Sequence, residues 1–373
     1  MRNKLISNAK RWVIKIGSAL LTQDGKGLDY QAIQDWAEQV VKLRQQGIEI
    51  ILVSSGAVAE GMSRMGWKTR PKTLYELQAA AAIGQMGLIQ AYESNFSKHN
   101  YHAAQILLTH DDLGNRRRYL NARNTLCTLL RLGTIPIVNE NDSVSFDEIQ
   151  LGDNDTLGAL VANLTDADLY IILTDQQGLF DADPRSNPNA KLISEAKAND
   201  KRLISFAGSA GTIQGTGGMA TKVTAAQRAA RSACPTIIAS GREPHVLERI
   251  HQKENIGSLL LPDTTQLVAR KQWIAGQLKS KGNIWLDSGA IKAIQKTGKS
   301  ILAIGVTKVE GEFQRGDVVS CLDTDGQLIA KGLINYAYTE ANKIKGKNSN
   351  EFAEILGFAD KPELIHRDNL VIC

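Results

Sequence analysis

The chain has 373 residues, of which 43% are hydrophobic and 22% charged, a composition that is typical of folded globular proteins of one or two domains and excludes a disordered chain. Its 44 Lys and Arg residues against 39 Asp and Glu residues give a formal net charge of +5, which is too dilute over this length to indicate a dedicated nucleic-acid binder. The four cysteines are far apart and form no CxxC pair, so neither a zinc site nor a redox dithiol is indicated.

From the first residues to about residue 260, short β-branched runs alternate with longer helical patterns. This alternation predicts βαβ units and an α/β fold with an open, mostly parallel sheet sandwiched by helices. The predicted strands are apolar enough to be buried on both faces. They span Trp12–Ile16, Ile48–Val53, Ala103–Leu107, Thr134–Val138, Leu169–Leu173 and Thr236–Ala239. Helical patterns cover Ile33–Arg44, Leu74–Phe96 and Thr221–Ala233, and the last two are rich in alanine.

The sequence pattern changes after about residue 276, where short runs of alternating apolar and polar residues are separated by turns rich in Gly, Asp and Asn. This pattern predicts a small β-rich domain. We therefore expect an α/β domain over 1–260, a linker over 261–277, a β-rich domain over 278–361 and a C-terminal tail over 362–373. No run approaches the roughly 20 apolar residues needed to cross a bilayer. The start has no apolar stretch of secretory length, because Lys15 interrupts it. A cytoplasmic protein without membrane contact is expected.

Four predicted strands are followed by loops of small and polar residues. These loops read Lys15-Ile16-Gly17-Ser18, Ser54-Ser55-Gly56-Ala57, Asn139-Glu140-Asn141-Asp142 and Thr174-Asp175. In an open parallel sheet the ligand crevice lies outside the carboxyl ends of the strands, so the loops together predict a binding site. For a single loop, turns and N-caps explain the same residues equally well. Lys15 is harder to explain in that way, because a lysine beside the end of a buried strand must find an anion or reach solvent.

Two further polar loops precede predicted helices. The first, Gly152-Asp153-Asn154-Asp155, has more polar side chains than one helix cap needs, which suggests a site for an amine, a lysine or a metal-bound phosphate. The second, Gly215 to Lys222, is glycine-rich and runs into a helix, so its N–H groups and the helix dipole can cradle phosphate oxygens while Lys222 adds a point charge. It is not a Walker A loop. It fits the loose dinucleotide fingerprint G-x-G-x-x-A, but no strand is predicted directly before it.

No histidine occurs in any of these loops, although general-base catalysis often uses one. A carboxylate nucleophile, with a reference pKa of about 4.3, is already ionised at pH 7 and needs no base. Its approach to an anionic phosphoryl group is opposed, because two unit charges 4 Å apart at an effective dielectric of 20 repel by about 4 kcal/mol. Lysines and a magnesium ion would offset that repulsion. If the nucleophile is a carboxylate, the two lysines of these loops would supply that compensation.

Taken together, the motifs resemble those of the bacterial glutamate 5-kinases of the amino acid kinase family, with a C-terminal PUA domain, over nearly the whole chain. The kinase motifs are Val13–Ser18, Ser54–Ala57, Asn139–Asp142, Gly152–Asp155, Leu173–Asp175, Gly178–Phe180, Asp183–Arg185 and Gly215–Lys222. The PUA-like motifs are Asp287–Ala290, Gly311–Phe313, Arg315–Asp317 and Ile329–Gly332. Two positions depart from the family pattern: Phe180 stands where tyrosine is common, and Gln177 stands where lysine is frequent.

The resemblance implies ATP-dependent phosphorylation of the γ-carboxylate of L-glutamate to L-glutamyl 5-phosphate, the first step of proline biosynthesis, with Mg²⁺ accompanying ATP. Lys15 and Lys222 would neutralise the phosphates, and Asp153 would orient the two lysines. Glutamate would be held by Ser55, Asp142 and Asn154. The nucleotide would be bound by Lys15, Thr174, Asp175, Thr216, Gly217, Gly218, Met219, Ala220, Thr221 and Lys222. Feedback inhibition by proline and a dimeric or tetrameric homo-oligomer are also expected from the family.

Two alternatives remain at this point. The first is a kinase for another carboxylate or carbamate, such as acetylglutamate or aspartate, although nothing in the β-rich part resembles the regulatory domains of aspartate kinases. The second is an RNA-binding module on a degenerate kinase fold. Loss of Lys15 or Lys222 would indicate such a module, but both lysines are present. PUA domains bind RNA in modification enzymes, but Lys and Arg only about balance Asp and Glu in this segment. A structural or regulatory role of that domain is therefore favoured.

Overall fold

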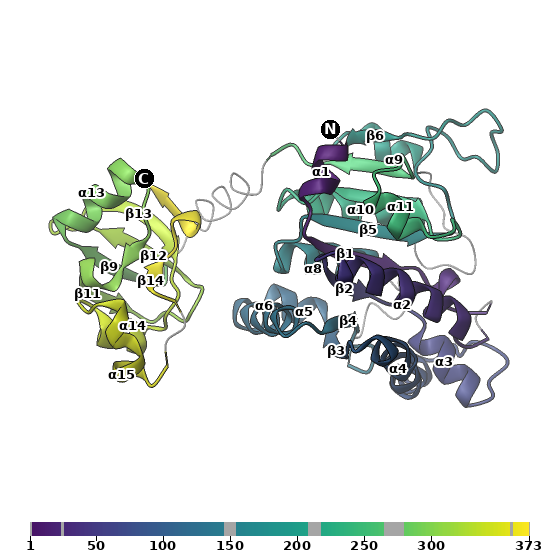
Figure 1. The fold of residues 1–373 in the computed structure, drawn as a ribbon, viewed down its shortest axis with the longest axis horizontal. Helices are drawn as coiled ribbons and strands as arrows, with labels where there is room; N and C mark the ends of the chain where they lie inside the picture. Colours follow the sequence, from purple (N-terminus) through teal and green to yellow (C-terminus); the bar gives the residue numbers. More distant parts are fainter. Residues whose placement is uncertain are drawn as a thin grey trace. The chain divides into compact units, whose positions relative to one another are not determined.

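The computed structural model describes residues 2–23, 26–144, 154–207, 218–264, 280–358 and 361–372, and the chain forms two compact units, Met1–Thr264 and Thr265–Cys373 (Figure 1). The first unit contains an eight-stranded sheet in the order β3-β4-β2-β1-β5-β7-β8-β6. Neighbouring strands are parallel except β7 and β8. The strands are β1 (Arg11–Ile16), β2 (Glu49–Val53), β3 (Ala103–Leu108), β4 (Ile135–Glu140), β5 (Leu169–Thr174), β6 (Glu195–Lys197), β7 (Thr236–Ser240) and β8 (Ser258–Leu261). The predicted open, mostly parallel sheet is confirmed.

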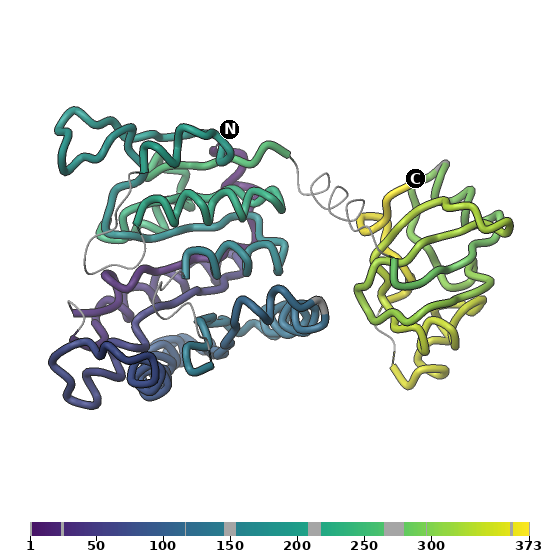
Figure 2. The backbone as a smooth tube through the Cα atoms, turned by 180° about the vertical axis from the view of Figure 1, so that it is seen from behind, coloured from purple at the N-terminus to yellow at the C-terminus, as the bar shows by residue number. Residues whose placement is uncertain are grey.

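Helices cover both faces of this sheet, and α2 lies in front of it in Figure 1 whereas α8 and α10 lie in front in the reverse view of Figure 2. One hydrophobic cluster joins the sheet to α1, α2, α4 and α11, and a second joins the opposite face to α6, α8, α9 and α10. The helices of this unit are α1 (Arg2–Asn8), α2 (Tyr30–Gln45), α3 (Ala57–Arg64), α4 (Leu74–Phe96), α5 (His110–Gly114), α6 (Arg116–Arg131), α8 (Asn154–Leu164), α9 (Arg202–Phe206), α10 (Met219–Ala230) and α11 (Val246–His251).

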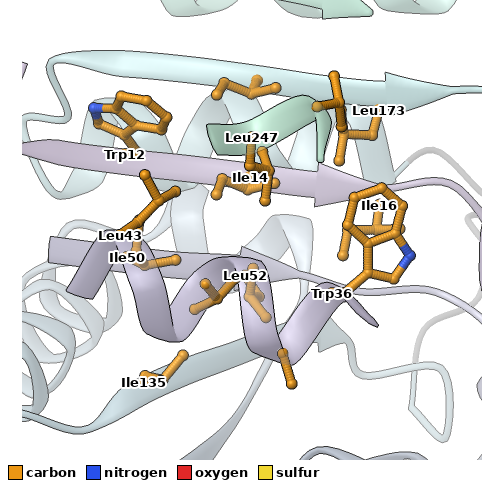
Figure 3. Packing of buried hydrophobic residues seen from close by; sticks show 14 of the residues in the cluster. Trp12, Ile14, Ile16, Trp36, Leu43, Ile50, Leu52, Ile135, Leu173 and Leu247 are labelled. Atoms are coloured by element: carbon orange, nitrogen blue, oxygen red, sulfur yellow. The ribbon is translucent and has the colours of Figure 1, made fainter. Parts of the chain in front are cut away.

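Strand β1 distributes its side chains between these two clusters by simple alternation. Trp12, Ile14 and Ile16 lie in the cluster beneath α2 and α11, as Figure 3 shows, whereas Val13 lies in the cluster beneath α8 and α10. Because successive side chains of a strand point to opposite faces, Lys15 shares the face of Val13. The one lysine of this strand is therefore directed toward α8 and α10.

Helices α3 and α4 touch along their backbones, because each has a glycine where they cross. A Cβ atom on Gly84 would lie 1.9 Å from the carbonyl oxygen of Ala57, and one on Gly61 would lie 1.8 Å from that of Ala80. Neither position can accept a side chain without separating the two helices. The glycine pair thus fixes α4 against the start of α3, which directly follows the loop after β2.

Most predicted elements agree with the structure, and α4 has the predicted limits. The prediction that every strand is buried on both faces is wrong for β3, whose residues are mostly only partly buried. The reason is its place at the edge of the sheet, where it has a neighbour, β4, on one side only. Strands β6 and β8 were not predicted from the sequence pattern, since they have only three and four residues.

The second unit has its own hydrophobic core beneath a five-stranded sheet in the order β11-β9-β12-β13-β15, and β10 pairs with β14. Its elements are β9 (Gly282–Leu286), α13 (Ser288–Thr297), β10 (Ile301–Leu302), β11 (Val306–Gly311), β12 (Val318–Leu322), β13 (Leu328–Leu333), α14 (Tyr338–Ile344), α15 (Phe352–Leu356), β14 (Glu363–Ile365) and β15 (Leu370–Ile372). The structure corrects the tail predicted over 362–373, because β14 and β15 lie within it and their residues Leu364 and Leu370 are buried. Residues 265–277 of the predicted linker lie outside the described residues.

Candidate active site

The centre of the candidate site is a buried carboxylate, Asp155, held between two lysines that are remote in the sequence. Lys15 Nζ lies 2.6 Å from Asp155 Oδ1, and Lys222 Nζ lies 3.0 Å from Asp155 Oδ2. Lys15, Asp155 and Lys222 are 6%, 1% and 5% exposed. The structure therefore brings the two predicted lysines to one carboxylate, and we refer to these three residues as the Lys–Asp–Lys triad.

Each member of the triad comes from an element whose position the fold dictates. Lys15 projects from β1 toward α8 and α10, and Asp155 and Lys222 lie in the first turns of these two helices. A carboxylate in the first turn of a helix is favoured by the helix dipole. The backbone of that turn is held from the sheet, because the hydroxyl of Tyr170 on β5 donates to the carbonyl oxygen of Asp155 at 2.8 Å. Gly158 leaves room for the Tyr170 ring, since a Cβ there would lie 2.4 Å from the hydroxyl oxygen.

The carboxylate of the triad stays ionised at neutral pH. Burial by itself would raise the pKa of Asp155, but the neighbouring ammonium groups of Lys15 and Lys222 lower it further than burial raises it, to about 2. The side-chain hydroxyl of Thr221 adds a donor to Asp155 Oδ2 at 3.3 Å. The triad itself combines two basic side chains with one carboxylate, which suits the binding of an anion beside the lysines.

The carboxylate between the two lysines, Asp155, had no role in the sequence prediction. Asp153, to which the orientation of the lysines was assigned, lies outside the described residues, and Asp155 is the carboxylate that bonds both ammonium groups. A signal for Asp155 was present in the helical pattern. It is four and seven residues before Ala159 and Ala162, which are buried on α8, so it shares their inward face.

A second group of polar side chains lies at the ends of β2 and β4. The side-chain Nδ2 of Asn154 donates to Ser55 Oγ at 3.0 Å, to the Ser54 carbonyl oxygen at 2.8 Å and to Asn139 Oδ1 at 3.1 Å. Two of the predicted glutamate-binding residues, Ser55 and Asn154, are thus in direct contact. The third, Asp142, is half-buried in the turn that follows β4. Because Asn154 directly precedes Asp155, this polar group adjoins the triad.

A pocket on the other side of the triad is formed by the end of β5, the segment after it and the start of α10. Its lining includes Lys222 and, of the predicted nucleotide-binding residues, Thr174, Asp175, Gly218 and Met219. The side chains of Phe180 and Phe206 give it an apolar part, and Arg185 gives it a cation. Thr216 and Gly217 lie outside the described residues.

The N-terminus of α10 opens toward this pocket. Its N-cap residue is Gly218, which forms no side-chain cap, and Met219, Ala220 and Thr221 make up the first turn. Helix N-termini of this kind present N–H groups that lack partners within the helix and favour phosphate oxygens. The pocket and the triad therefore share Lys222, which is one turn into the same helix.

Across the ranges that the structure describes, no three His, Cys, Asp or Glu side chains come close enough together to hold a metal ion. None of the described helices combines the length and the apolar character required to cross a membrane.

Comparison with known proteins gives the family. The sequence profile of the amino acid kinase family matches residues 10–240, which include every member of the triad. The chain belongs to the amino acid kinase family. The profile of the PUA domain matches residues 282–356, within the second unit. Both parts of the resemblance inferred from the motifs are confirmed.

This amino acid kinase has relatives that match it from end to end. It is 62% identical over 367 residues to the glutamate 5-kinase of Thioalkalivibrio sulfidiphilus, covering 98% of each chain. It is 61% identical over 363 residues to the glutamate 5-kinase of Nitrosococcus oceani, covering 97% of each chain. It is 59% identical over 371 residues to that of Methylococcus capsulatus, covering 100% of this chain and 99% of the relative.

Proposed function

We propose that this amino acid kinase transfers the γ-phosphoryl group of ATP to the γ-carboxylate of L-glutamate, which gives L-glutamyl 5-phosphate and ADP, the first step of proline biosynthesis. The observation that carries the proposal is the buried Lys–Asp–Lys triad between the pocket at the start of α10 and a polar group at the ends of β2 and β4. The end-to-end similarity to proteins named glutamate 5-kinase supports glutamate as the acceptor.

In the proposed reaction, an oxygen of the glutamate γ-carboxylate attacks the γ-phosphorus and the bond from that phosphorus to the ADP oxygen breaks. The nucleophile is ionised at neutral pH and needs no general base. The difficulty is the approach of two anions, which costs about 4 kcal/mol for unit charges 4 Å apart at an effective dielectric of 20. Lys15 and Lys222 offset this cost by attracting the phosphoryl oxygens, and their effect is greatest in the transition state, where the charge is spread over those oxygens.

Asp155 acts in this scheme as the residue that positions both lysines. A lysine side chain is flexible, and two ammonium groups close together repel each other. A shared carboxylate with one oxygen for each ammonium group keeps both in place before substrate binds. Because the carboxylate is ionised well below neutral pH, its negative charge is available to both lysines throughout the physiological range.

The remaining assignments are those expected from the motifs. Ser55, Asp142 and Asn154 bind glutamate. Thr174, Asp175 and the loop from Thr216 to Lys222 bind the nucleotide, together with Lys15. Mg²⁺ would accompany the phosphates of ATP, where it would neutralise part of their charge.

Three broader features of the family complete the proposal. Proline acts as a feedback inhibitor near the glutamate site, the chain assembles as a dimer or tetramer, and it works in the cytoplasm. The PUA unit has a structural or regulatory role. RNA binding by this unit is the competing function, and it would show as tight, salt-sensitive association.

The test is ADP formation that depends on L-glutamate, combined with hydroxylamine trapping of the acyl phosphate over a panel of glutamate, N-acetylglutamate and aspartate, each with and without proline. We expect a signal with glutamate that proline diminishes. Silence with glutamate and a signal with another acid would overturn the substrate assignment. Salt-sensitive RNA binding without any ATP turnover would favour the competing function.

A further inference from the structure

A buried glutamine on α4, which no motif singled out, contacts the proposed glutamate site. Gln85 is 8% exposed and lies on the inward face of the helix among Ala81 and Leu88. Its Oε1 accepts a hydrogen bond from Asn139 Nδ2 at 2.9 Å. An apolar side chain would suit the surrounding core better, because burying an amide carries a desolvation cost. The contact with Asn139 is therefore the feature that explains a glutamine at this position.

Gln85 is the end of a chain of three amides that leads to the substrate loops. Asn154 Nδ2 donates to Asn139 Oδ1, and Asn139 Nδ2 donates to Gln85 Oε1. Two backbone groups that have only one hydrogen-bonding role show which way all three amides are oriented. The Ser54 carbonyl oxygen can only accept, so Asn154 must direct its Nδ2 toward it, and the Glu140 N–H can only donate, so Asn139 must direct its Oδ1 toward it.

This orientation determines which end of the Asn154 amide is left for a ligand. The two hydrogens of Asn154 Nδ2 are shared among three acceptor oxygens, whereas Asn154 Oδ1 accepts from no donor among the described residues. An amide oxygen accepts hydrogen bonds and attracts a cation, and the cationic group of an amino acid is its α-ammonium. The amide chain therefore suits an acceptor that carries an α-ammonium group and does not suit the same dicarboxylate without one.

We propose that Gln85 is a positioning residue for the amino-acid substrate, acting through Asn139 to hold Asn154 with its carbonyl oxygen available to the α-ammonium group. The proposal rests on the proposed function and adds the residue that determines selectivity for an amino acid. Gln85 Nε2 is buried and has no hydrogen-bond partner among the described residues. The only part of this amide that forms a hydrogen bond within the described residues is therefore Oε1, which accepts from Asn139. Removing that acceptor leaves Asn139 Nδ2 buried without a partner, which favours rotation of the Asn139 amide and disturbs Asn154.

The test compares the KM for L-glutamate with the inhibition constant of glutarate, the dicarboxylate that lacks the α-ammonium group, in the full-length chain. Gln85→Met keeps the size of the side chain and removes the acceptor. We expect it to raise the KM for glutamate about tenfold, to leave the inhibition constant of glutarate and the KM for ATP within twofold, and to change kcat little. Gln90→Met is the matched control on the exposed side of the same helix, and it should match wild type.

A second variant covers the case in which Gln85→Met does not fold. Gln85→Glu presents an oxygen to Asn139 in either protonation state, so the ratio of the two constants should stay within about twofold of wild type. Two results would refute the role of Gln85 while wild type remains active on glutamate. One is a changed ratio of the KM for glutamate to the inhibition constant of glutarate in a folded Gln85→Glu, and the other is an unchanged ratio in a folded Gln85→Met. Absence of wild-type turnover with glutamate would overturn the proposed function, and this proposal with it.

Discussion

Replacing Asp155 by asparagine tests the triad most directly, because it removes one charge and almost no volume. In the folded chain the carboxylate bonds two buried ammonium groups. Asparagine retains an oxygen that can accept from one lysine, but it removes the negative charge that both ammonium groups share. We expect kcat to fall by at least about 100-fold, in line with the loss of preorganised charge at a transferring group.

The same substitution has a calculable effect on stability. The pKa of Asp155 falls from 3.8 to about 2 on folding. At about 1.36 kcal/mol per pKa unit, this shift contributes about 2 kcal/mol to the free energy of unfolding at neutral pH. Breaking a buried ion pair by removing one partner costs about 3–5 kcal/mol, since the remaining charge is left unpaired. The free energy of unfolding of Asp155→Asn should therefore be lower than that of wild type by about 2 to 5 kcal/mol.

The pH dependence has a definite sign. The pKa of Asp155 is lower in the folded than in the unfolded chain, so its contribution is complete above about pH 4 and is lost as the pH falls through about 2. Denaturant unfolding of wild type and Asp155→Asn between pH 7 and pH 2.5 should show a constant difference down to about pH 4 and a narrowing difference below it. A difference that widens in acid, or equal stability at pH 7, would refute the reasoning.

Asp166→Asn is the matched control for this experiment. Asp166 pairs with Arg123 at 2.6 Å, but their side chains are 34% and 31% exposed. A partly exposed ion pair is worth less than about 1 kcal/mol. Asp166 also has a φ of 51°, which asparagine adopts readily. The control should therefore lose less than about 1 kcal/mol and keep full activity.

Lys222→Ala should lower kcat by about 100-fold or more, while its near-ultraviolet circular dichroism spectrum stays like that of wild type. Lys98→Ala on the surface is the control and should have no effect on kcat. Wild-type turnover of Lys222→Ala would show that this lysine does not contact the transferring group. Gly158→Ala should destabilise the chain by about 1–3 kcal/mol in denaturant unfolding, although the same change inside a helix ordinarily stabilises, because the new Cβ would lie 2.4 Å from the Tyr170 hydroxyl. Gly114→Ala meets nothing within 4 Å and is its control, and a stable Gly158→Ala would mean that Tyr170 can move away.

The sheet was predictable because its strands are long apolar runs separated by helical patterns, and those signals depend on local sequence. The short strands β6 and β8 were missed, since three or four residues carry too little pattern to distinguish them from loops. The partial exposure of β3 was also missed. Whether a strand lies at the edge or in the centre of a sheet depends on the strand order, which is set only when the whole sheet assembles.

The site was predicted in the same uneven way. Lys15 and Lys222 were found because a lysine at a strand end and one after a glycine-rich loop are locally unusual. The contact of Asp155 with both lysines was missed, because the spacing of two carboxylates in one loop does not say which of them faces the sheet, whereas the helical phase with buried alanines places Asp155 there. Gln85 carried no local signal at all. Its contact with Asn139 joins residues far apart in sequence and exists only after α4 has packed against the ends of the strands.

The crossing of α3 and α4 through Gly61 and Gly84 has a mechanical consequence for substrate entry. With their backbones in contact, the two helices are expected to move as one rigid body. This body carries Gln85, and it begins directly after the serine loop at the end of β2. Any closure around the proposed glutamate site must then take its hinge from segments outside the helix pair, and α3 and α4 would move together with Gln85.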